Sequence, residues 1–530
     1  MEPSVHPARA LWRSSAIISL MTLLSRLSGF VREMVLAAVI GAGPMANAFH
    51  VAFRISNVFR SFLAEGAFSA SFVPILSRTA QADKDKAVHY ANQVFTLLLG
   101  ILIVLVGVAE FYMPTLVGGW APGFEQGSAV FERTVLCSRV AFPYLICMSL
   151  GSLWAGVLAS EHRFALAAVA PVFLNLFLIG FGWYFSDHPD VGVFLCLGIV
   201  ISGLFQMGLL YYGCRRRHFT FQLVWPKLSP EVRLFLKNML PGILGASLIQ
   251  INLWCGTIIA TFFGSAVSLM YYADRLVQLP LALIGTALGT ALLPYLSQNR
   301  EQARSAGIIS ATLVVILPLA ALMYSMAYEM VALTLQHGKF SAADTAETTV
   351  ILAIFSLALP AFVMNKVLTP FFNAHYNTKT PFQLALVGLT VNLSFNYVWF
   401  YTFHTYVGIA WATVASAWVN SLLLLGVAWY KGYIALDRQW CYDCLKLLIL
   451  AATVMGGMWA WSSDPIEGID LVYRFLAKGT VGVMTTVMLL ALLNPYQSRV
   501  LIARVLGMTK TFVLKKVEWD AASNKEGSDC

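Results

Sequence analysis

Charged residues are scarce in this chain, at 12% of its 530 positions, whereas soluble domains carry about 25%. Hydrophobic residues make up 58%, and they gather in uncharged runs near the ~20 residues that a helix needs to cross a bilayer. These runs lack a two-residue alternation, so helices are the spanning structure that fits them. The composition therefore excludes an ordinary soluble domain and predicts an all-α integral membrane protein.

The signature motifs of several enzyme classes are also absent. The sequence contains no G-x-x-x-x-G-K-[ST] phosphate loop, no H-E-x-x-H metal pair and no G-x-S-x-G nucleophile elbow. The eight cysteines are scattered, and the single C-x-x-C of Cys441 and Cys444 has neither a second pair nor a nearby histidine cluster. We therefore expect no catalytic residue, no bound metal and no cofactor.

Fourteen stretches are predicted to span the membrane as helices, each near the length that a bilayer requires. Their approximate limits are 14–40, 47–74, 88–112, 131–158, 165–185, 191–213, 238–262, 267–297, 306–334, 347–373, 381–400, 407–430, 445–461 and 471–493.

The distribution of lysine and arginine predicts the orientation of these spans. With a cytoplasmic N-terminus, the segments inside the cell hold 24 of the 35 lysines and arginines, and the outside loops hold one, Lys339. Cytoplasmic loops of membrane proteins carry such an excess. Both termini are thus predicted to be cytoplasmic, and the net charge of +9 reports topology rather than binding of nucleic acid.

A basic loop at 214–237 divides the first twelve spans into six and six. A faint repeat supports this division, because S-F-V-P-I-L-S-R at 71–78 is similar to A-L-L-P-Y-L-S-Q at 291–298. Six-helix repeats of one orientation are typical of transporters whose substrate site lies between the halves. The predicted domains are an N-lobe at 1–213, the loop at 214–237, a C-lobe at 238–430, two further spans at 431–493 and a cytoplasmic tail at 494–530.

The first two spans carry buried charge of mainly one sign. Their charged residues are Arg26, Arg32, Glu33, Arg54, Arg60 and Glu65. A charge at bilayer depth costs about 2.5–3.5 kcal/mol on insertion scales, so these side chains are expected to line a wet cavity, pair with one another or bind an anionic ligand. The eighth span adds Asp274 and Arg275, which leaves the balance cationic. Because the guanidinium fork suits phosphate, we predict a substrate that carries phosphate or pyrophosphate; snorkelling toward a span end is the alternative for Arg32 and Arg60.

Three motifs resemble those of one known family. They are S-R-L-S-G-F-V-R-E at 25–33, N-A-F-H-V-A-F-R-I-S-N-V-F-R-S-F-L-A-E-G-A-F-S-A-S-F-V-P-I-L at 47–76 and Y-Y-A-D-R-L-V-Q-L-P-L-A-L-I-G-T-A-L-G-T-A-L-L-P at 271–294. They look like the MurJ/MviN lipid II flippases, and the resemblance covers essentially the whole chain. It implies two six-helix lobes in a V, two extra C-terminal helices and alternating access in the bacterial inner membrane. The implied function is to move lipid II, the undecaprenyl-pyrophosphate-linked peptidoglycan precursor, from the cytoplasmic to the periplasmic leaflet.

The same resemblance implies roles for individual residues. The diphosphate and headgroup would be bound by Arg26, Arg32, Arg54, Arg60 and Arg275. Supporting ion pairs and gating would fall to Asn47 and Glu65 by this resemblance, and to Glu33 and Asp274 because of their charge within the spans. Asn47 stands where some relatives carry aspartate, and spans 13 and 14 would form the groove for the polyprenyl tail.

The driving force and the further partners are left open by the sequence. Sodium ions, protons and the membrane potential are all candidates, and spans 7, 11 and 12 show Asn252, Asn392 and Asn396 rather than a carboxylate cluster. Lipid II and the bilayer are the expected partners, and other cell-wall synthesis proteins are candidates. The alternative functions are export of another polyprenyl-linked glycan and a non-transporting membrane scaffold for cell-wall synthesis.

Overall fold

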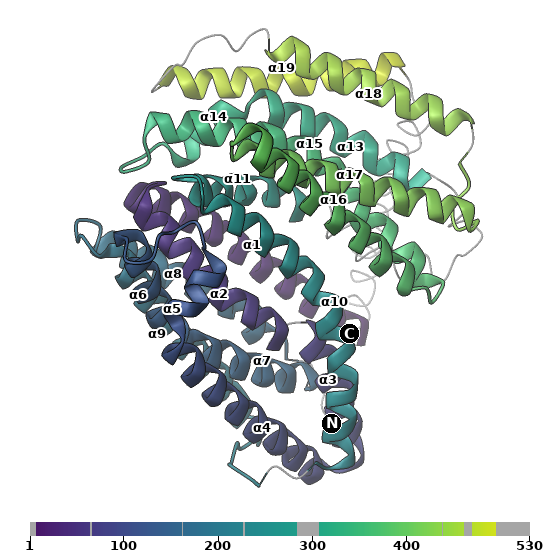
Figure 1. Cartoon of the computed structure of the whole chain (residues 1–530). Helices are drawn as coiled ribbons and strands as arrows, with labels where there is room; N and C mark the ends of the chain where they lie inside the picture. Colours follow the sequence, from purple (N-terminus) through teal and green to yellow (C-terminus); the bar gives the residue numbers. More distant parts are fainter. Residues whose placement is uncertain are drawn as a thin grey trace, which may run out of the picture. The chain divides into compact units, whose positions relative to one another are not determined.

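The computed structural model describes residues 7–63, 66–161, 163–225, 228–282, 307–436, 438–459 and 469–493. Every regular element in these ranges is a helix (Figure 1), which confirms the predicted all-α class. Three predicted features lie outside the described residues: Glu65, the end of the eighth span with its repeat motif at 291–298, and the tail at 494–530.

The helices keep the labels of Figure 1, with one number unused. They are α1 (Pro7–Ile40), α2 (Pro44–Leu63), α3 (Gly66–Ala82), α4 (Lys84–Phe111), α5 (Met113–Trp120), α6 (Ala129–Ala141), α7 (Tyr144–Ser160), α8 (Ala165–Tyr184), α9 (Val191–Arg215), α10 (Pro230–Ala260), α11 (Ala266–Pro280), α13 (Gly307–Ser325), α14 (Ala327–Leu335), α15 (Ala342–Ala374), α16 (Lys379–Phe403), α17 (Val407–Tyr430), α18 (Arg438–Trp459) and α19 (Ile469–Leu493).

Several helix limits differ from the predicted ones for local reasons. The stretch predicted as one span at 131–158 is two helices, α6 and α7, which meet at Phe142 and Pro143, because proline has no N–H to continue the ladder. α10 begins at Pro230, eight residues before the predicted span, because Ser229 Oγ accepts the N–H of Val232 at 3.3 Å and caps the first turn. The short helix α5 was not predicted at all.

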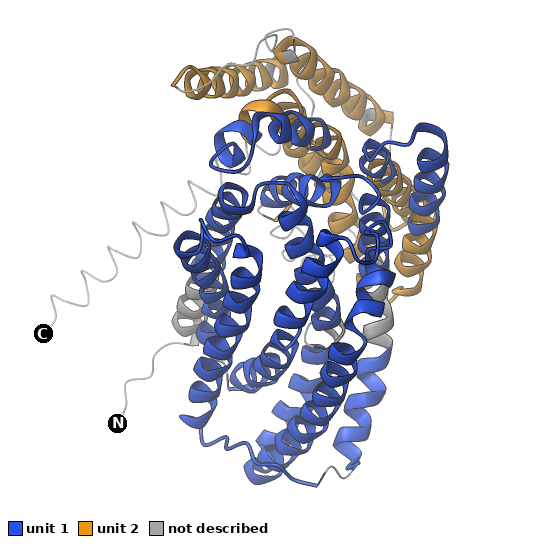
Figure 2. Cartoon of the chain, turned by 60° about the vertical axis from the view of Figure 1, so that its left-hand side comes forward, with its two compact units in different colours: residues 1–279, 331–351, 389–412 blue, residues 280–330, 352–388, 413–530 orange. Residues whose placement is uncertain are grey.

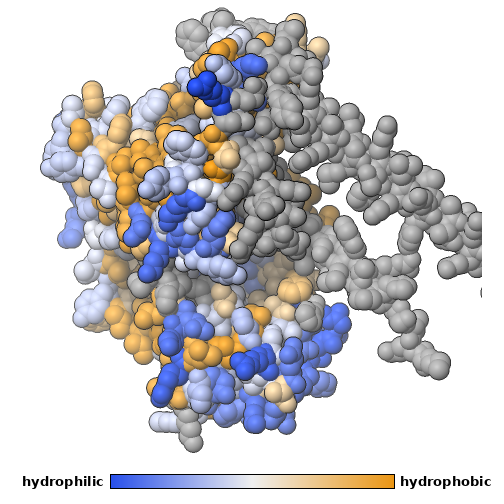
Figure 3. Space-filling view, turned by 90° about the vertical axis from the view of Figure 1, so that its right-hand side faces the viewer, coloured by the Kyte–Doolittle hydropathy of each residue, from blue (hydrophilic) through white to orange (hydrophobic). Residues whose placement is uncertain are grey.

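Nine helical stretches of the described part are long and apolar enough to cross a membrane. They lie at 84–111, 129–160, 165–184, 191–215, 308–325, 342–374, 379–403, 407–430 and 440–458. Helix α4 exposes Ile103, Val104 and Phe111 by 56%, 65% and 76%, as lipid contact would allow. Figure 3 shows apolar side chains gathered over broad areas of one face.

The chain forms two compact units, which are coloured in Figure 2. Unit 1 comprises 1–279, 331–351 and 389–412, and unit 2 comprises 280–330, 352–388 and 413–530. Helix α10 and most of α11, from the predicted C-lobe, thus group with the helices of the predicted N-lobe. The predicted lobe limits remain predictions.

Unit 2 contains a buried charge cluster that the sequence did not reveal. Glu329 of α14 accepts hydrogen bonds from Arg474 Nε and Lys478 Nζ of α19, each at 2.6 Å. Glu329 and Lys478 are fully buried. Gly482, one turn further along α19, packs so closely that an added Cβ would lie 2.2 Å from Leu322 Cδ2. These contacts hold α19 against the preceding helices of the same unit.

Candidate functional site

An ion pair on α1 begins the charged centre of unit 1. Arg32 pairs with Glu33, and its Nη1 donates to Asn175 Oδ1 of α8 at 2.8 Å. The Asn175 amide in turn donates to Ser25 O at 3.0 Å and to Ser28 Oγ at 2.8 Å. One buried asparagine therefore fixes both the backbone of α1 and the direction of the Arg32 side chain.

Tyr271 of α11 connects this pair to the next arginine. Its hydroxyl donates to Glu33 Oε1 at 3.3 Å, and the Arg275 guanidinium lies 4.6 Å from the centre of its ring, a cation–π contact. Arg275 Nη1 also donates to Gln278 Oε1 at 3.2 Å, and the Gln278 amide donates to Asp274 Oδ2. Tyr271 therefore contacts Glu33 of α1 through its hydroxyl and Arg275 of α11 through its ring.

Arg54 completes the centre from α2. Its guanidinium donates to Thr257 Oγ1 of α10, and the charges of Asp274 and Arg275 act on it. Arg275 likewise acts on Arg32. We call Arg32, Glu33, Arg54, Asp274 and Arg275 the arginine cluster; its three cations and two carboxylates leave an excess of positive charge.

The cluster keeps donor capacity in reserve. Arg32 Nε and Arg275 Nε are buried donors without a hydrogen-bond partner among the described residues, and the acceptor Glu33 Oε2 is also buried without one. An unused N–H beside an excess positive charge favours an anion, since a guanidinium can give two parallel hydrogen bonds to a phosphate. The arrangement can therefore bind a phosphate or diphosphate.

The other predicted site residues are placed differently. Arg26 is exposed on α1, nearly two turns before Arg32. Arg60 is half-buried on α2, where it donates to Asn57 Oδ1 at 3.0 Å, and its charge acts on Tyr144 of α7. The roles proposed for Arg26, Arg60 and Glu65 stay predictions.

Asn47 joins α2 to the start of α11. Its amide donates to Gly264 O at 2.6 Å, and its Oδ1 accepts the N–H of Ser268 at 3.0 Å. Ser268 Oγ donates to Ala42 O at 2.5 Å, and the Tyr272 hydroxyl donates to Gly41 O at 3.0 Å. We call this set of hydrogen bonds the α2–α11 link.

A second contact fastens the end of α1 beside this link. The N–H of Lys339 donates to Ala38 O at 2.8 Å. Gly338, at φ +57°, approaches so closely that a Cβ would lie 2.4 Å from Ala38 O, so a larger residue does not fit there. The ends of α1 and α2 are therefore held to segments distant in the sequence.

Three residues of this region were missed or under-used by the sequence reasoning. Tyr271 lies four residues before Arg275, a spacing that puts both on one helix face, so its cation–π role could have been found. Asn175, which bonds Arg32 and the backbone of α1, is not among the residues that the sequence assigned to the site. His50, which stacks on Tyr271 at a centroid distance of 3.9 Å, carried no local signal beyond being polar in an apolar helix.

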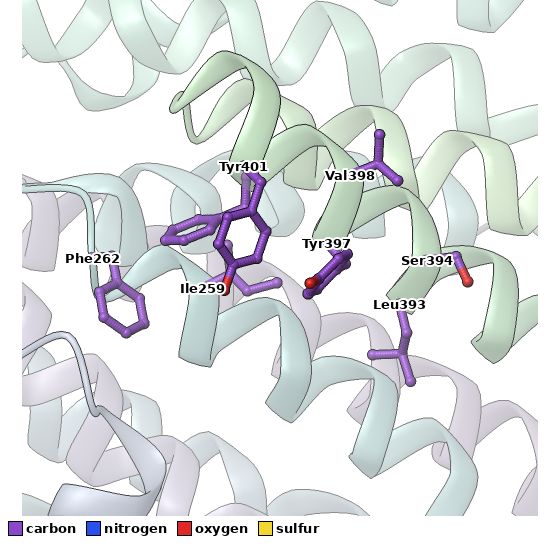
Figure 4. Close-up of a pocket in the computed structure, with 8 residues that line it drawn as sticks. Ile259, Phe262, Leu393, Ser394, Tyr397, Val398 and Tyr401 are labelled. Carbon is purple, nitrogen blue, oxygen red and sulfur yellow. The ribbon is translucent and has the colours of Figure 1, made fainter.

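A separate pocket of unit 1 has the opposite chemistry. It has a volume of about 770 Å³ and lies between α10 and α16. Figure 4 shows Tyr397 and Tyr401 of α16 beside Ile259 of α10 and Phe262 of the turn that follows α10. Its lining is apolar except for the tyrosine hydroxyls and Ser394, and none of the described residues around it is charged. It suits a hydrocarbon chain rather than a diphosphate.

Comparison with known proteins places this geometry in a family. Residues 36–478 match the family model described as lipid II flippase MurJ. The chain belongs to the MurJ family. It is 37% identical over 474 residues to a probable lipid II flippase MurJ of Rhizobium meliloti (strain 1021), covering 86% of this chain and 88% of the relative. It is 32% identical over 455 residues to the counterpart from Rickettsia prowazekii (strain Madrid E), covering 84% and 89%. The resemblance inferred from the motifs is confirmed.

Solved structures show the same fold. A MurJ lipid II flippase in an inward closed conformation matches with a TM-score of 0.78 at 19% identity, over 90% of this chain and 98% of that one. An inward-facing MATE-family multidrug resistance transporter of the MOP superfamily matches with a TM-score of 0.60 at 14% identity, over 85% and 99%. The MurJ fold therefore carries the arginine cluster, and the family is one of transporters rather than enzymes.

Proposed function

We propose that this chain moves lipid II from the cytoplasmic to the periplasmic leaflet of the bacterial inner membrane by alternating access. The observation that carries the proposal is the arginine cluster, whose excess positive charge is drawn from α1, α2 and α11. The diphosphate of a polyprenyl-linked precursor matches it in charge and in hydrogen-bonding geometry. Membership of the MurJ family supports lipid II over other diphosphate-linked lipids.

The cluster would drive transport by binding one state better than another. A ligand shifts a conformational equilibrium only by its differential affinity for the two states. Arg32 and Arg54 reach the cluster from α1 and α2, whereas Arg275 reaches it from α11. A diphosphate held by all three would favour the state that keeps these helices together, and its release would remove that bias.

The charges of the arginine cluster favour the membrane potential as the energy source for transport. Moving one elementary charge across 100 mV is worth about 2.3 kcal/mol, so the membrane potential can act directly on a cationic cluster and its anionic cargo. Sodium or proton coupling is the alternative. Two of the asparagines found in spans 7, 11 and 12 in place of a carboxylate cluster bond to each other: Asn396 Nδ2 donates to Asn392 Oδ1 at 2.9 Å. This hydrogen bond uses part of the bonding capacity of both amides.

The proposed topology has both termini in the cytoplasm, from the distribution of lysine and arginine. The α2–α11 link then lies on the periplasmic side, where it would act as a gate. Helices α18 and α19, which follow the predicted twelve-span repeat, would hold the polyprenyl tail. Other cell-wall synthesis proteins remain candidate partners.

The proposal is tested in cells depleted of their own flippase and complemented with this chain. We expect restored growth and restored exposure of lipid II on the outer leaflet, measured with an impermeant reagent that modifies or cleaves periplasmic lipid II. Membrane insertion is measured in parallel. An inserted chain that leaves lipid II inside but exposes another lipid-linked glycan would support the exporter alternative. An inserted chain that exposes neither would support the scaffold reading.

Asn47→Ala should weaken the closed α2–α11 link. It removes the bonds to Gly264 O and from the Ser268 N–H, each worth about 0.5–1.5 kcal/mol, so the open state should gain roughly 5- to 150-fold in population. Asn47→Asp should lie between wild type and Asn47→Ala, because a carboxylate accepts from Ser268 but cannot donate to Gly264. Labelling of a cysteine placed at Ala266, which is buried at the start of α11 and makes none of the hydrogen bonds of the link, by an impermeant thiol reagent measures this opening. Equal labelling in all three backgrounds would show that Asn47 does not hold the gate.

A further inference from the structure

His50 lies between the two functional features of α2. It follows Asn47 of the α2–α11 link by three residues and precedes Arg54 of the arginine cluster by four, so all three share one helix face. Its side chain is buried, with an exposed fraction of 1%. The proposed transport mechanism assigns it no role.

The imidazole is enclosed by aromatic rings rather than by polar groups. It stacks on Tyr271 at a centroid distance of 3.9 Å and an interplanar angle of 27°, and it meets the edge of Tyr272 at 5.2 Å and 88°. Neither ring nitrogen has a hydrogen-bond partner among the described residues. Leaving a buried polar group without a hydrogen bond destabilises the folded state. Stacking alone therefore does not explain a histidine here, since phenylalanine would stack without that cost.

In this state, the charged and titratable groups described around the ring provide no hydrogen-bond acceptor for a protonated imidazole. Arg32, Arg54 and Arg275 act on the imidazole from α1, α2 and α11. From α11, the Tyr271 and Tyr272 hydroxyls donate away from it, to Glu33 Oε1 and Gly41 O. Glu33 thus lies beyond Tyr271, and Asp274 accepts from Gln278. An imidazolium would place two N–H donors and a fourth positive charge where only cations and aromatic rings face it.

We propose that His50 is a proton-binding site of the gate, and that a proton bound there favours the state in which α11 has separated from α2. Separation removes Tyr271 from the ring face and lets water reach both nitrogens. Protonation and closure of the α2–α11 link then exclude each other. The inference rests on the proposed function in one respect, that this link opens during transport.

The direction of the pH effect follows from proton linkage. If only the open state binds the proton, each unit fall in pH multiplies the open-to-closed ratio by up to about tenfold, within the range between the proton affinities of the two states. Low pH therefore opens the gate, and high pH closes it. Acidity on the periplasmic side would favour the outward state.

The test is a distance measurement that needs no lipid II. Spin labels are attached through non-native amino acids at Tyr184 and Phe262, which are exposed by 82% and 50% near the outer ends of α8 and α10. The full chain is reconstituted in nanodiscs and measured between pH 8 and pH 5.5. We expect the long-distance population to grow at least tenfold toward pH 5.5 in the wild type and to stay constant in His50→Phe, which keeps the stacking and lacks the proton site.

The controls make every outcome decisive. His50→Gln, which is polar and does not titrate, should also be insensitive to pH, and it replaces His50→Phe if that variant does not insert. A pH response that persists in either variant assigns the proton to another group, such as Glu33, and overturns the proposal; so does a wild type without a response. Failure of the chain to expose lipid II in cells would leave this distance result standing, so the two proposals fail separately.

Discussion

Arg275→Ala will abolish the rescue of flippase-depleted cells, whereas Arg216→Ala will leave it intact. The two arginines are a matched pair. Each follows a tyrosine by four residues and lies over its ring, with 4.6 Å from Arg275 to Tyr271 and 4.7 Å from Arg216 to Tyr212. Arg216 is exposed just after α9, whereas Arg275 belongs to the buried arginine cluster. A general loss of arginine–tyrosine stacking would affect both variants equally.

The size of the effect follows from what Arg275 contributes. A hydrogen bond to a charged group is worth about 1.5–3 kcal/mol, which corresponds to roughly 10- to 150-fold in diphosphate affinity. Arg275→Lys keeps the charge and loses the planar fork, so it should retain partial activity. The measurement is exposure of lipid II on the outer leaflet, normalised to the amount of inserted protein. Full activity of inserted Arg275→Ala would show that the cluster is structural and that the diphosphate binds elsewhere.

Arg32→Ala should resemble Arg275→Ala in transport but not in its structural consequence. Arg32 pairs with Glu33 and with Asn175, so its loss also frees the asparagine that fixes α1. Arg275 is therefore the better residue for the transport test. Its hydrogen-bond partner Gln278 lies on its own helix, so its loss breaks no hydrogen bond between the described helices.

The sequence predicted the helices well because their cause is local. Length, apolarity and the placement of lysine and arginine are properties of short stretches. The helix limits differ where a single residue changes the backbone: Pro143 interrupts the helix inside the stretch at 129–160, which is still one candidate span, and Ser229 starts α10 early. Both signals were present in the sequence and could have been used.

The sequence predicted that cationic side chains gather, but not which residues they contact. Arg32, Arg54 and Arg275 act on one another electrostatically, while the anion site inferred from the excess of cationic residues in apolar spans stays a prediction. The long-range contact partners of the site residues could not be predicted from the sequence. Tyr271 reaches Glu33 across 238 residues of sequence, and Asn47 reaches Gly264 across 217. Helical phase orders the residues of one helix, but it cannot say which faces of two distant helices meet.

Glu329→Ala should destabilise the chain more than Arg275→Ala or Asn47→Ala does. It removes the carboxylate that accepts hydrogen bonds from Arg474 and Lys478. The positive charges of Arg474 and Lys478 then stay inside unit 2 without this partner. Removing one partner of a buried ion pair costs about 3–5 kcal/mol. Thermal unfolding in detergent, with hydrogen exchange of 469–493 as a local readout, measures the effect. Lys86→Ala, which breaks the exposed pair with Asp83, is the control and should change little.

Replacing the whole cluster separates charge from packing. Burying ions carries a desolvation cost, and hydrophobic residues of similar volume are often neutral or stabilising in place of a buried ion pair or triad. The triple variant Glu329→Met, Arg474→Met, Lys478→Met should therefore regain most of the stability that Glu329→Ala loses. If it stays as unstable as Glu329→Ala, then specific hydrogen bonds rather than charge balance hold α19. If it is stable but transports poorly, the cluster is retained for the position that it gives α19, the helix proposed to contact the polyprenyl tail.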